Sequence, residues 1–135
     1  MPFNYTRTVR FADTDAAGVV FFANYLKFCH EAYEESLAAA GIELQTFFKS
    51  TGVVVPISKS ETSYLRPLFP GDKLRITATP ELLSETSFAI RYELFRVTAP
   101  EKLAARARTE HVATSPEKRE RVALPPALAA WVAAG

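Results

Sequence analysis

One long helical pattern near the start of the chain limits the possible folds more than any other feature. Across residues 24–40, apolar or small side chains recur three and four positions apart, and charged side chains fill the positions between them. The small residues Ala32, Ser36 and Ala39 would let the backbone of this helix lie close against a sheet. Gly41 suits the end of the helix, because glycine readily adopts the left-handed conformation common there. We therefore expect one long helix in this part of the chain.

Most of the remaining chain alternates between apolar and polar residues, which is the pattern of strands with one buried face. The predicted strands are residues 3–11, 53–65, 73–83, 87–97 and 103–113. Short connections join the last three strands, which favours antiparallel hairpins. Residues 43–51 form a connection with room for a helical turn around Thr46. Residues 116–121 predict a solvated loop, and residues 124–133 predict a short helix entered through two prolines.

This order of elements predicts an α+β fold, with one long helix packed on a five-stranded antiparallel sheet. The chain has 135 residues, enough for one domain with a substantial core, so we expect residues 1–135 to form a single domain. One helix cannot cover so wide a sheet. The uncovered apolar surface and the open sheet edge therefore favour a homodimer or a larger assembly.

Composition excludes several classes of function. A formal net charge of +1 gives no broad positive surface for nucleic acid or for an anionic membrane. No apolar run approaches the roughly 20 residues of a membrane span, and no secretion signal is recognisable, so we expect a cytoplasmic protein. One cysteine and two histidines make no credible zinc site, and we predict neither a metal nor a cofactor. Cys29 falls in the helical pattern and is expected to be a buried structural thiol.

An acidic turn that contains glycine lies directly before the long helix. Asp13 and Asp15 are followed by Gly18 and by the apolar residues 19–22, so we expect at least one of the two carboxylates to be buried. The first N–H groups of a helix lack partners within it and carry partial positive charge, so they can stabilise a developing oxyanion. An acid beside them suits acyl chemistry. The same residues are also ordinary loop and capping residues, and their types alone do not decide between the two interpretations.

Several motifs occur in the order and at the spacing of one protein family. They are Arg10-Phe11, the block Asp13-x-Asp15-x-x-Gly18-Val19-Val20-Phe21, Asn24-Tyr25, Leu65-Arg66-Pro67 and Gly71-Asp72. Nearly the whole chain thereby resembles the hotdog-fold acyl-CoA thioesterases of the 4-hydroxybenzoyl-CoA thioesterase type. The resemblance implies a hotdog fold, in which a curved antiparallel sheet wraps around a long central helix. It also implies a homodimer or homotetramer with its sites at subunit interfaces.

The resemblance assigns the chemistry to Asp15 and Phe22. It implies that the Asp15 carboxylate acts as nucleophile or general base toward a thioester carbonyl, and that the backbone N–H of Phe22 polarises this carbonyl. The substrate is then a coenzyme A thioester, and water is the only other reactant. We expect Gly18, Val19 and Tyr25 to contact the substrate beside these two residues.

Basic residues are the candidates for the phosphates of coenzyme A. Lys59 and Arg66 are the two that we predict to bind the substrate. Arg91, Arg106 and Arg108 are also available, and an ordinary charged surface explains any one of these residues equally well.

The residues at the helix start favour an aromatic acyl group. Members that resemble the broad-range Tol-Pal-associated thioesterases usually carry histidine where this chain has Phe22, and an apolar ring suits an aromatic group better. Asn24-Tyr25-Leu26 together with residues 29–37 resembles the 1,4-dihydroxy-2-naphthoyl-CoA hydrolases of phylloquinone (vitamin K1) synthesis. Three alternatives stay open: a broad-range or benzoyl-type thioesterase, a hotdog dehydratase, and a non-catalytic acyl-binding protein.

The other acids and histidines have simpler interpretations. Asp13 is expected to hold the turn, because two ionised carboxylates this close repel each other. Neither His30 nor His111 has a partner visible in the sequence, although a dehydratase would need His30 to work with an acid across a dimer. Another hotdog lineage carries its catalytic acid on the central helix. Here the acids at that place, Glu31, Glu34 and Glu35, fit the solvent face of the helix.

Overall fold

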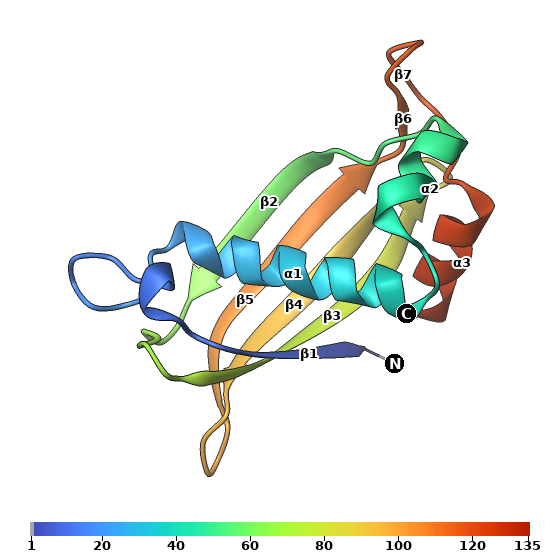
Figure 1. Cartoon of the computed structure of the whole chain (residues 1–135). Helices are drawn as coiled ribbons and strands as arrows, with labels where there is room; N and C mark the ends of the chain where they lie inside the picture. The colour runs from blue at the N-terminus through green and yellow to red at the C-terminus, as the bar shows by residue number, and fades with distance from the viewer. Residues whose placement is uncertain (1) are drawn as a thin grey trace.

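A computed structural model describes residues 2–135 as one layer of sheet with a long helix across it (Figure 1). The strands are β1 (Phe3–Thr8), β2 (Ile57–Tyr64), β3 (Lys73–Ser84), β4 (Ser87–Arg96), β5 (Lys102–Val112), β6 (Thr114–Ser115) and β7 (Glu120–Arg121). The helices are the short 3-10 turn η1 (Phe11–Asp13), α1 (Ala23–Ala39), α2 (Leu44–Thr51) and α3 (Pro126–Ala134). The predicted α+β order of elements is confirmed.

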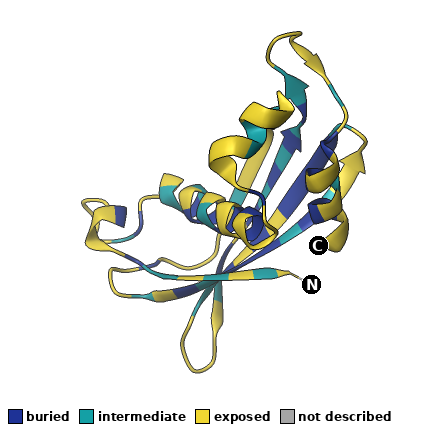
Figure 2. Cartoon of the chain, turned by 45° about the vertical axis from the view of Figure 1, so that its right-hand side comes forward, coloured by how far each residue is buried: buried dark blue, intermediate teal, exposed yellow. Residues whose placement is uncertain are grey.

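The main sheet has five antiparallel strands in the order β1-β3-β4-β5-β2. It curves around α1, as the sequence predicted, and β1 and β2 form its two edges (Figure 1). Buried side chains concentrate in α1 and in the central strands (Figure 2). Phe28, Ala32 and Leu37 of α1 are completely buried, and the small side chain of Ala32 lets the helix pack close to the sheet.

The helix ends where the sequence predicted. Gly41 has a φ of 81°, which lies in the left-handed region, and its N–H donates to the carbonyl of Ala38. The tail helix α3 packs back onto α1, because Trp131 Nε1 donates a hydrogen bond of 2.9 Å to Ser36 Oγ. The expected structural role of Cys29 agrees with its burial, which raises the pKa of its thiol far above the usual range.

Several boundaries differ from the prediction. The strand predicted over residues 3–11 ends at Thr8, because the chain turns into η1. The strand predicted over residues 53–65 starts only at Ile57, directly after Pro56, since proline has no N–H for a strand ladder. The connection before it contains a complete helix, α2, and residues 116–121 close a small hairpin of β6 and β7.

The two sides of the sheet differ in polarity. The side that faces α1 holds the core, whereas the outer side carries charged residues, among them Arg91, Arg106 and Arg108. At the edge, every residue of β2 except Thr62 is exposed. Within residues 2–135, no helix is long and apolar enough to cross a membrane.

Candidate active site

The loop that carries Asp15 is a tight hairpin. The backbone N–H of Asp15 donates to the carbonyl of Val19 at 2.9 Å, and Gly18 donates to the carbonyl of Asp15 at 3.0 Å. Three residues therefore make the turn, and Gly18 takes its last position with a φ of 81°, which favours glycine. The carboxylate of Asp15 also accepts a hydrogen bond of 2.9 Å from the N–H of Ala17. Gly18 thus shapes the turn that presents Asp15.

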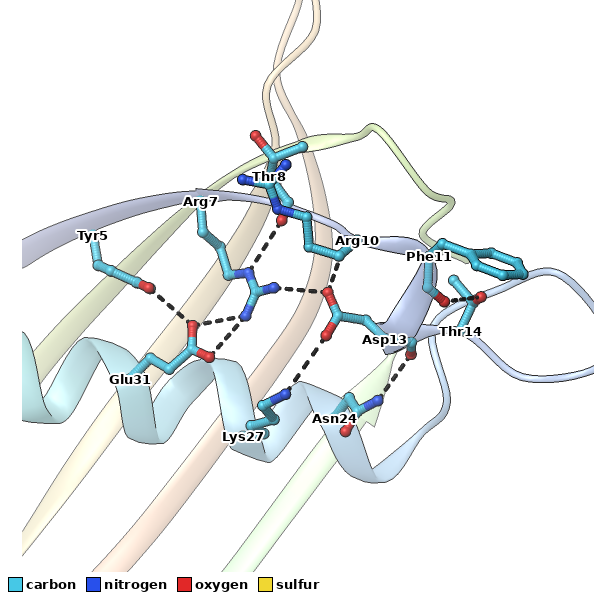
Figure 3. A network of polar contacts seen from close by, with 10 residues as sticks. All are labelled: Tyr5, Arg7, Thr8, Arg10, Phe11, Asp13, Thr14, Asn24, Lys27 and Glu31. Carbon is cyan, nitrogen blue, oxygen red and sulfur yellow. Dashed lines mark hydrogen bonds and ion pairs between the residues drawn. The ribbon is translucent and has the colours of Figure 1, made fainter.

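The neighbouring Asp13 is the buried acid of the turn, with only 3% of its surface exposed. Its Oδ2 accepts hydrogen bonds from Arg7 Nη2 at 2.7 Å and from the backbone N–H of Arg10 at 2.8 Å, and Lys27 Nζ lies 3.6 Å from Oδ1 (Figure 3). These contacts compensate the cost of burying its charge. They agree with the structural role predicted for Asp13.

Arg7 connects this anchor to the middle of α1. Its Nη1 donates to both carboxylate oxygens of Glu31 at 2.8 Å (Figure 3). The guanidinium also lies over the ring of Phe28. Tyr5 donates a further hydrogen bond of 2.9 Å to Glu31, and burial together with this carboxylate raises the pKa of Tyr5 to about 12. The prediction that Glu31 lies on a plain solvent face was therefore wrong, because β1 covers that part of the helix.

A single carbonyl group ties the hairpin to the start of α1. The carbonyl oxygen of Asp13 accepts a hydrogen bond of 3.0 Å from the N–H of Phe21. It also accepts one of 2.8 Å from Asn24 Nδ2 (Figure 3). Asp15 lies two residues after Asp13, and Phe22 directly follows Phe21. The position of the Asp15 loop is thus fixed relative to the first residues of the helix.

The start of α1 lacks the usual capping. Its N-cap residue is Phe22, which has helical dihedral angles (φ −53°, ψ −36°) and no side chain that could accept a hydrogen bond. Within residues 2–135, no group accepts a hydrogen bond from the Phe22 N–H. This N–H and the positive end of the helix therefore stay available to an external carbonyl oxygen.

Asp15 and Phe22 line one open cavity of about 420 Å³. The other lining residues are Val19, Val20, Phe21, Tyr25, Tyr64, Leu65, Arg66 and Pro67. The structure thus gathers five of the residues named from the sequence, namely Asp15, Val19, Phe22, Tyr25 and Arg66, around one space. Asp15 is exposed, so water reaches its carboxylate.

Tyr64 is a part of this site that the sequence did not reveal. Its hydroxyl donates to the carbonyl of Phe22 at 3.2 Å, and its ring packs edge to face on Tyr25 with 4.9 Å between centroids. Tyr25 in turn donates a hydrogen bond of 3.3 Å to the carbonyl of Arg66. Burial, and to a smaller extent the nearby Tyr64, raises the pKa of Tyr25. Strand alternation could have placed Tyr64 on the helix side of β2, but not opposite Phe22.

Both histidines lie outside the cavity. His111 is buried, with one ring nitrogen 2.8 Å from Thr109 Oγ1 and the other 3.4 Å from the carbonyl of Val55, and burial lowers its pKa to about 4. Nδ1 of His30 lies 3.1 Å from a carboxylate oxygen of Glu34. His111 is therefore a packing residue, and His30 belongs to the exposed side of α1.

The remaining basic candidates also lie elsewhere. Lys59 is an exposed residue of β2 and does not line the Asp15 cavity. Arg91, Arg106 and Arg108 line a separate hollow on the outer side of the sheet. Arg108 pairs with Glu110 and Glu81 there. Of the basic residues named from the sequence, Arg66 is the one that the structure places at the cavity.

Comparisons with known proteins agree with this fold. Residues 9–132 match the thioesterase-like superfamily. A 1,4-dihydroxy-2-naphthoyl-CoA hydrolase from Crocosphaera subtropica is 47% identical over 128 residues, which cover 95% of this chain and 93% of that protein. A hydrolase of the same name from Rippkaea orientalis is 48% identical over 129 residues, which cover 96% of this chain and 94% of that protein.

A solved structure gives the same result in three dimensions. The crystal structure of a 1,4-dihydroxy-2-naphthoyl-CoA thioesterase from Synechocystis superposes with a TM-score of 0.92 at 34% sequence identity. The superposition covers 98% of this chain and 96% of that one. The predicted hotdog fold, a curved five-stranded antiparallel sheet around a long helix, is confirmed.

Proposed function

The chain belongs to the thioesterase-like superfamily, and we propose that it hydrolyses 1,4-dihydroxy-2-naphthoyl-CoA to the free naphthoic acid and coenzyme A. Similarity over nearly the full length to hydrolases of this thioester supports the acyl group. The observation that carries the chemistry is the shared cavity, where the Asp15 carboxylate and the free N–H of Phe22 meet.

Phe22 would bind the carbonyl oxygen of the thioester. When a nucleophile adds to the carbonyl carbon, this oxygen gains negative charge, and the N–H at the helix start stabilises the charge most strongly in the tetrahedral transition state. The N–H needs no rearrangement for this role, because no group within residues 2–135 accepts its hydrogen bond. Tyr64 holds the adjoining peptide group in place through the carbonyl of Phe22.

Asp15 would supply the reacting carboxylate in one of two ways. As a general base, it takes a proton from water while the water oxygen bonds to the carbonyl carbon; the C–S bond then breaks, and the thiolate receives a proton. As a nucleophile, it bonds to the carbonyl carbon itself and expels the thiolate, and water then hydrolyses the resulting anhydride. Both routes consume one water molecule and release the same two products.

A second copy of the chain is expected to close the cavity. Large apolar side chains surround Asp15 and stay exposed in the isolated chain, including Phe21 (43%), Phe22 (61%), Tyr64 (47%) and Leu65 (48%). The nearby strand β2 also leaves one edge unpaired within residues 2–135. Such an edge and such a patch are commonly covered by a partner. We therefore propose a homodimer, or a homotetramer built from two such dimers.

In the bound substrate, the coenzyme A part would extend out of the cavity past Arg66. Its Nη1 donates a hydrogen bond of 2.7 Å to the carbonyl of Leu103, which holds the guanidinium at the rim. Its other N–H groups have no acceptor within residues 2–135 and could bind phosphate oxygens. Lys59 does not line the Asp15 cavity of its own chain, so its predicted role in substrate binding would require that it reaches the cavity of a second subunit. A place in phylloquinone synthesis and a cytoplasmic location complete the proposal.

A panel of thioesters tests the acyl group. Release of free thiol should be fastest with 1,4-dihydroxy-2-naphthoyl-CoA, and slower with benzoyl-CoA and with a fatty acyl-CoA. Rapid cleavage of benzoyl or fatty esters with no preference for the naphthoyl ester would point to the benzoyl-type or broad-range thioesterase instead. Binding of all three without thiol release would leave an acyl-binding protein. A 3-hydroxyacyl-CoA completes the panel, and loss of water from it without thiol release would identify a dehydratase.

A further inference from the structure

Three cavities lie in a row between α1 and the edge strand β2. The first is the Asp15 cavity, lined by Phe22 on α1 and Tyr64 on β2. The second, of about 100 Å³, is lined by Leu26 and His30 on α1 and by Ile57 and Ser60 on β2. The third, of about 340 Å³, again contains His30 and Ile57 and adds Glu34. We call this row the helix–strand groove.

The helix residues of the groove form one stripe. Phe22, Leu26, His30 and Glu34 are spaced four apart, so they lie on the same face of α1. From Phe22 to His30 the helix rises about 12 Å, which is eight residues at about 1.5 Å each. Side chains on a helix lean toward its N-terminus, and the His30 ring lines the second cavity together with Leu26, one turn before it. A single aromatic ring that carries a carbonyl group and a hydroxyl meta to it, with a hydrogen bond to each of these two groups, spans a comparable length.

Beyond the Asp15 cavity the lining of the groove is mostly apolar, and its polar residues are two tyrosines, His30, Glu34, Ser60, Thr109 and His111. Its last part is lined by side chains such as Leu44, Phe48 and Val54, and its polar lining is small. His30 lines both the second and the third cavity and lies one turn of α1 beyond Leu26, so an aromatic acyl group that extends past Leu26 would meet it. A flat aromatic group suits the apolar walls, and a hydroxyl at its far side would find this ring nitrogen.

Glu34 sets which hydrogen bond His30 can make. A carboxylate only accepts hydrogen bonds, so the Nδ1 of His30, 3.1 Å from Glu34 Oε1, carries the proton of the neutral ring. Nε2 then has a free lone pair and accepts a hydrogen bond from a phenolic O–H. An acyl group that lacks this hydroxyl would leave Nε2 without that partner.

We propose that His30 is a specificity-determining residue that accepts a hydrogen bond from the 4-hydroxyl of the naphthoyl group, the hydroxyl farther from the thioester. This inference rests on the proposed function, because the thioester must lie at Phe22 for the ring to lie along the groove. Glu34 acts through His30 as a positioning residue. The groove thereby distinguishes hydroxylated naphthoyl groups from naphthoyl groups without the 4-hydroxyl.

Two substrates that differ only in that hydroxyl test the proposal. The ratio of kcat/KM for 1,4-dihydroxy-2-naphthoyl-CoA to that for 1-hydroxy-2-naphthoyl-CoA should be well above one in the wild type. In His30→Phe this ratio should fall about 10- to 100-fold, because the acceptor is lost while a ring remains. Glu34→Ala should lower the ratio less. Glu35→Ala, at an exposed position of α1 outside the groove, should leave it unchanged.

The ratio is insensitive to how much of a variant is folded, since both substrates meet the same sample. An unchanged ratio in His30→Phe, or a wild type that cleaves both esters equally well, would overturn the inference and leave the hydrolase intact. A wild type that cleaves neither ester would refute the proposed function itself. A second readout is the ¹⁵N chemical shift of His30 Nε2. It should move when 1,4-dihydroxy-2-naphthoate is added, and it should not move with 1-hydroxy-2-naphthoate.

Discussion

Asp13 and Asp15 are two residues apart in the same turn, yet their surroundings are opposite. Asp13 is buried and accepts hydrogen bonds from Arg7 and from the N–H of Arg10. Asp15 is exposed, and within residues 2–135 its carboxylate accepts a hydrogen bond only from the N–H of Ala17. The comparison teaches that one acid holds the loop and leaves the carboxylate of the other open to solvent, as the proposed reaction requires.

The same division recurs at the first residues of α1. Asn24 uses its side chain to bind the carbonyl of Asp13, and so it belongs to the anchored region. The N–H of Phe22, in contrast, has no acceptor within residues 2–135 and belongs to the region that we propose to be reactive. A site that stabilises a transient charge needs both conditions, since fixed donors cost little reorganisation when the charge appears.

Removing the anchor should have the largest effect on stability. Asp13→Ala leaves Arg7 buried without one of its two carboxylate partners, so the free energy of unfolding should fall by about 3–5 kcal/mol. Chemical denaturation measures this change. Asp15→Ala is the matched control and should lower the same free energy by about 1 kcal/mol or less. Equal losses in the two variants would erase the distinction between the two acids.

Removing the donor at Phe22 should reduce activity and spare the fold. Phe22→Pro deletes the free N–H, and its φ of −53° already suits proline, so kcat for thiol release should fall about 100- to 1000-fold. Phe22→Leu keeps the N–H and should retain most of the activity. The Phe22 assignment fails if the proline variant folds normally and keeps a wild-type kcat.

Removing the hydrogen bond that connects the anchored turn to the start of α1 should give the smallest effect. Asn24→Ala removes the hydrogen bond from Nδ2 to the carbonyl of Asp13, so the free energy of unfolding should fall by about 1 kcal/mol. Because the Asp15 loop is then held less firmly beside Phe22, kcat should fall about 10-fold. Chemical denaturation and a thiol-release assay on the same sample measure the effect on stability and the effect on kcat separately. A loss of stability with no loss of kcat would show that the anchor does not position the site.

The sequence was sufficient for the elements with long, regular patterns. The helical stripe of α1 and the alternation of β3, β4 and β5 predict a helix and three strands correctly, because each pattern extends over at least ten residues. Shorter or irregular segments were missed. The eight residues of α2 bury none of their side chains, and Pro56 delays the start of β2 in a way that alternation does not reveal.

The site was predictable where it is local in the sequence. Asp15, Val19, Phe22 and Tyr25 lie within one short stretch, and the family motif covers them. Tyr64 was missed because its hydrogen bond to Phe22 joins residues 42 positions apart. The partial burial and the ion pair of Glu31 were missed for the same reason, since Arg7 and Tyr5 approach it from β1. Such contacts depend on how the strands pack against α1.

The most direct test compares kcat and stability in Asp15→Asn, a variant that keeps the size of the side chain and removes its charge. The account predicts that thiol release from 1,4-dihydroxy-2-naphthoyl-CoA falls by about 1000-fold or more, with a denaturation midpoint close to that of the wild type. A kcat within a few-fold of the wild type would contradict it. So would a loss of stability as large as that of Asp13→Ala.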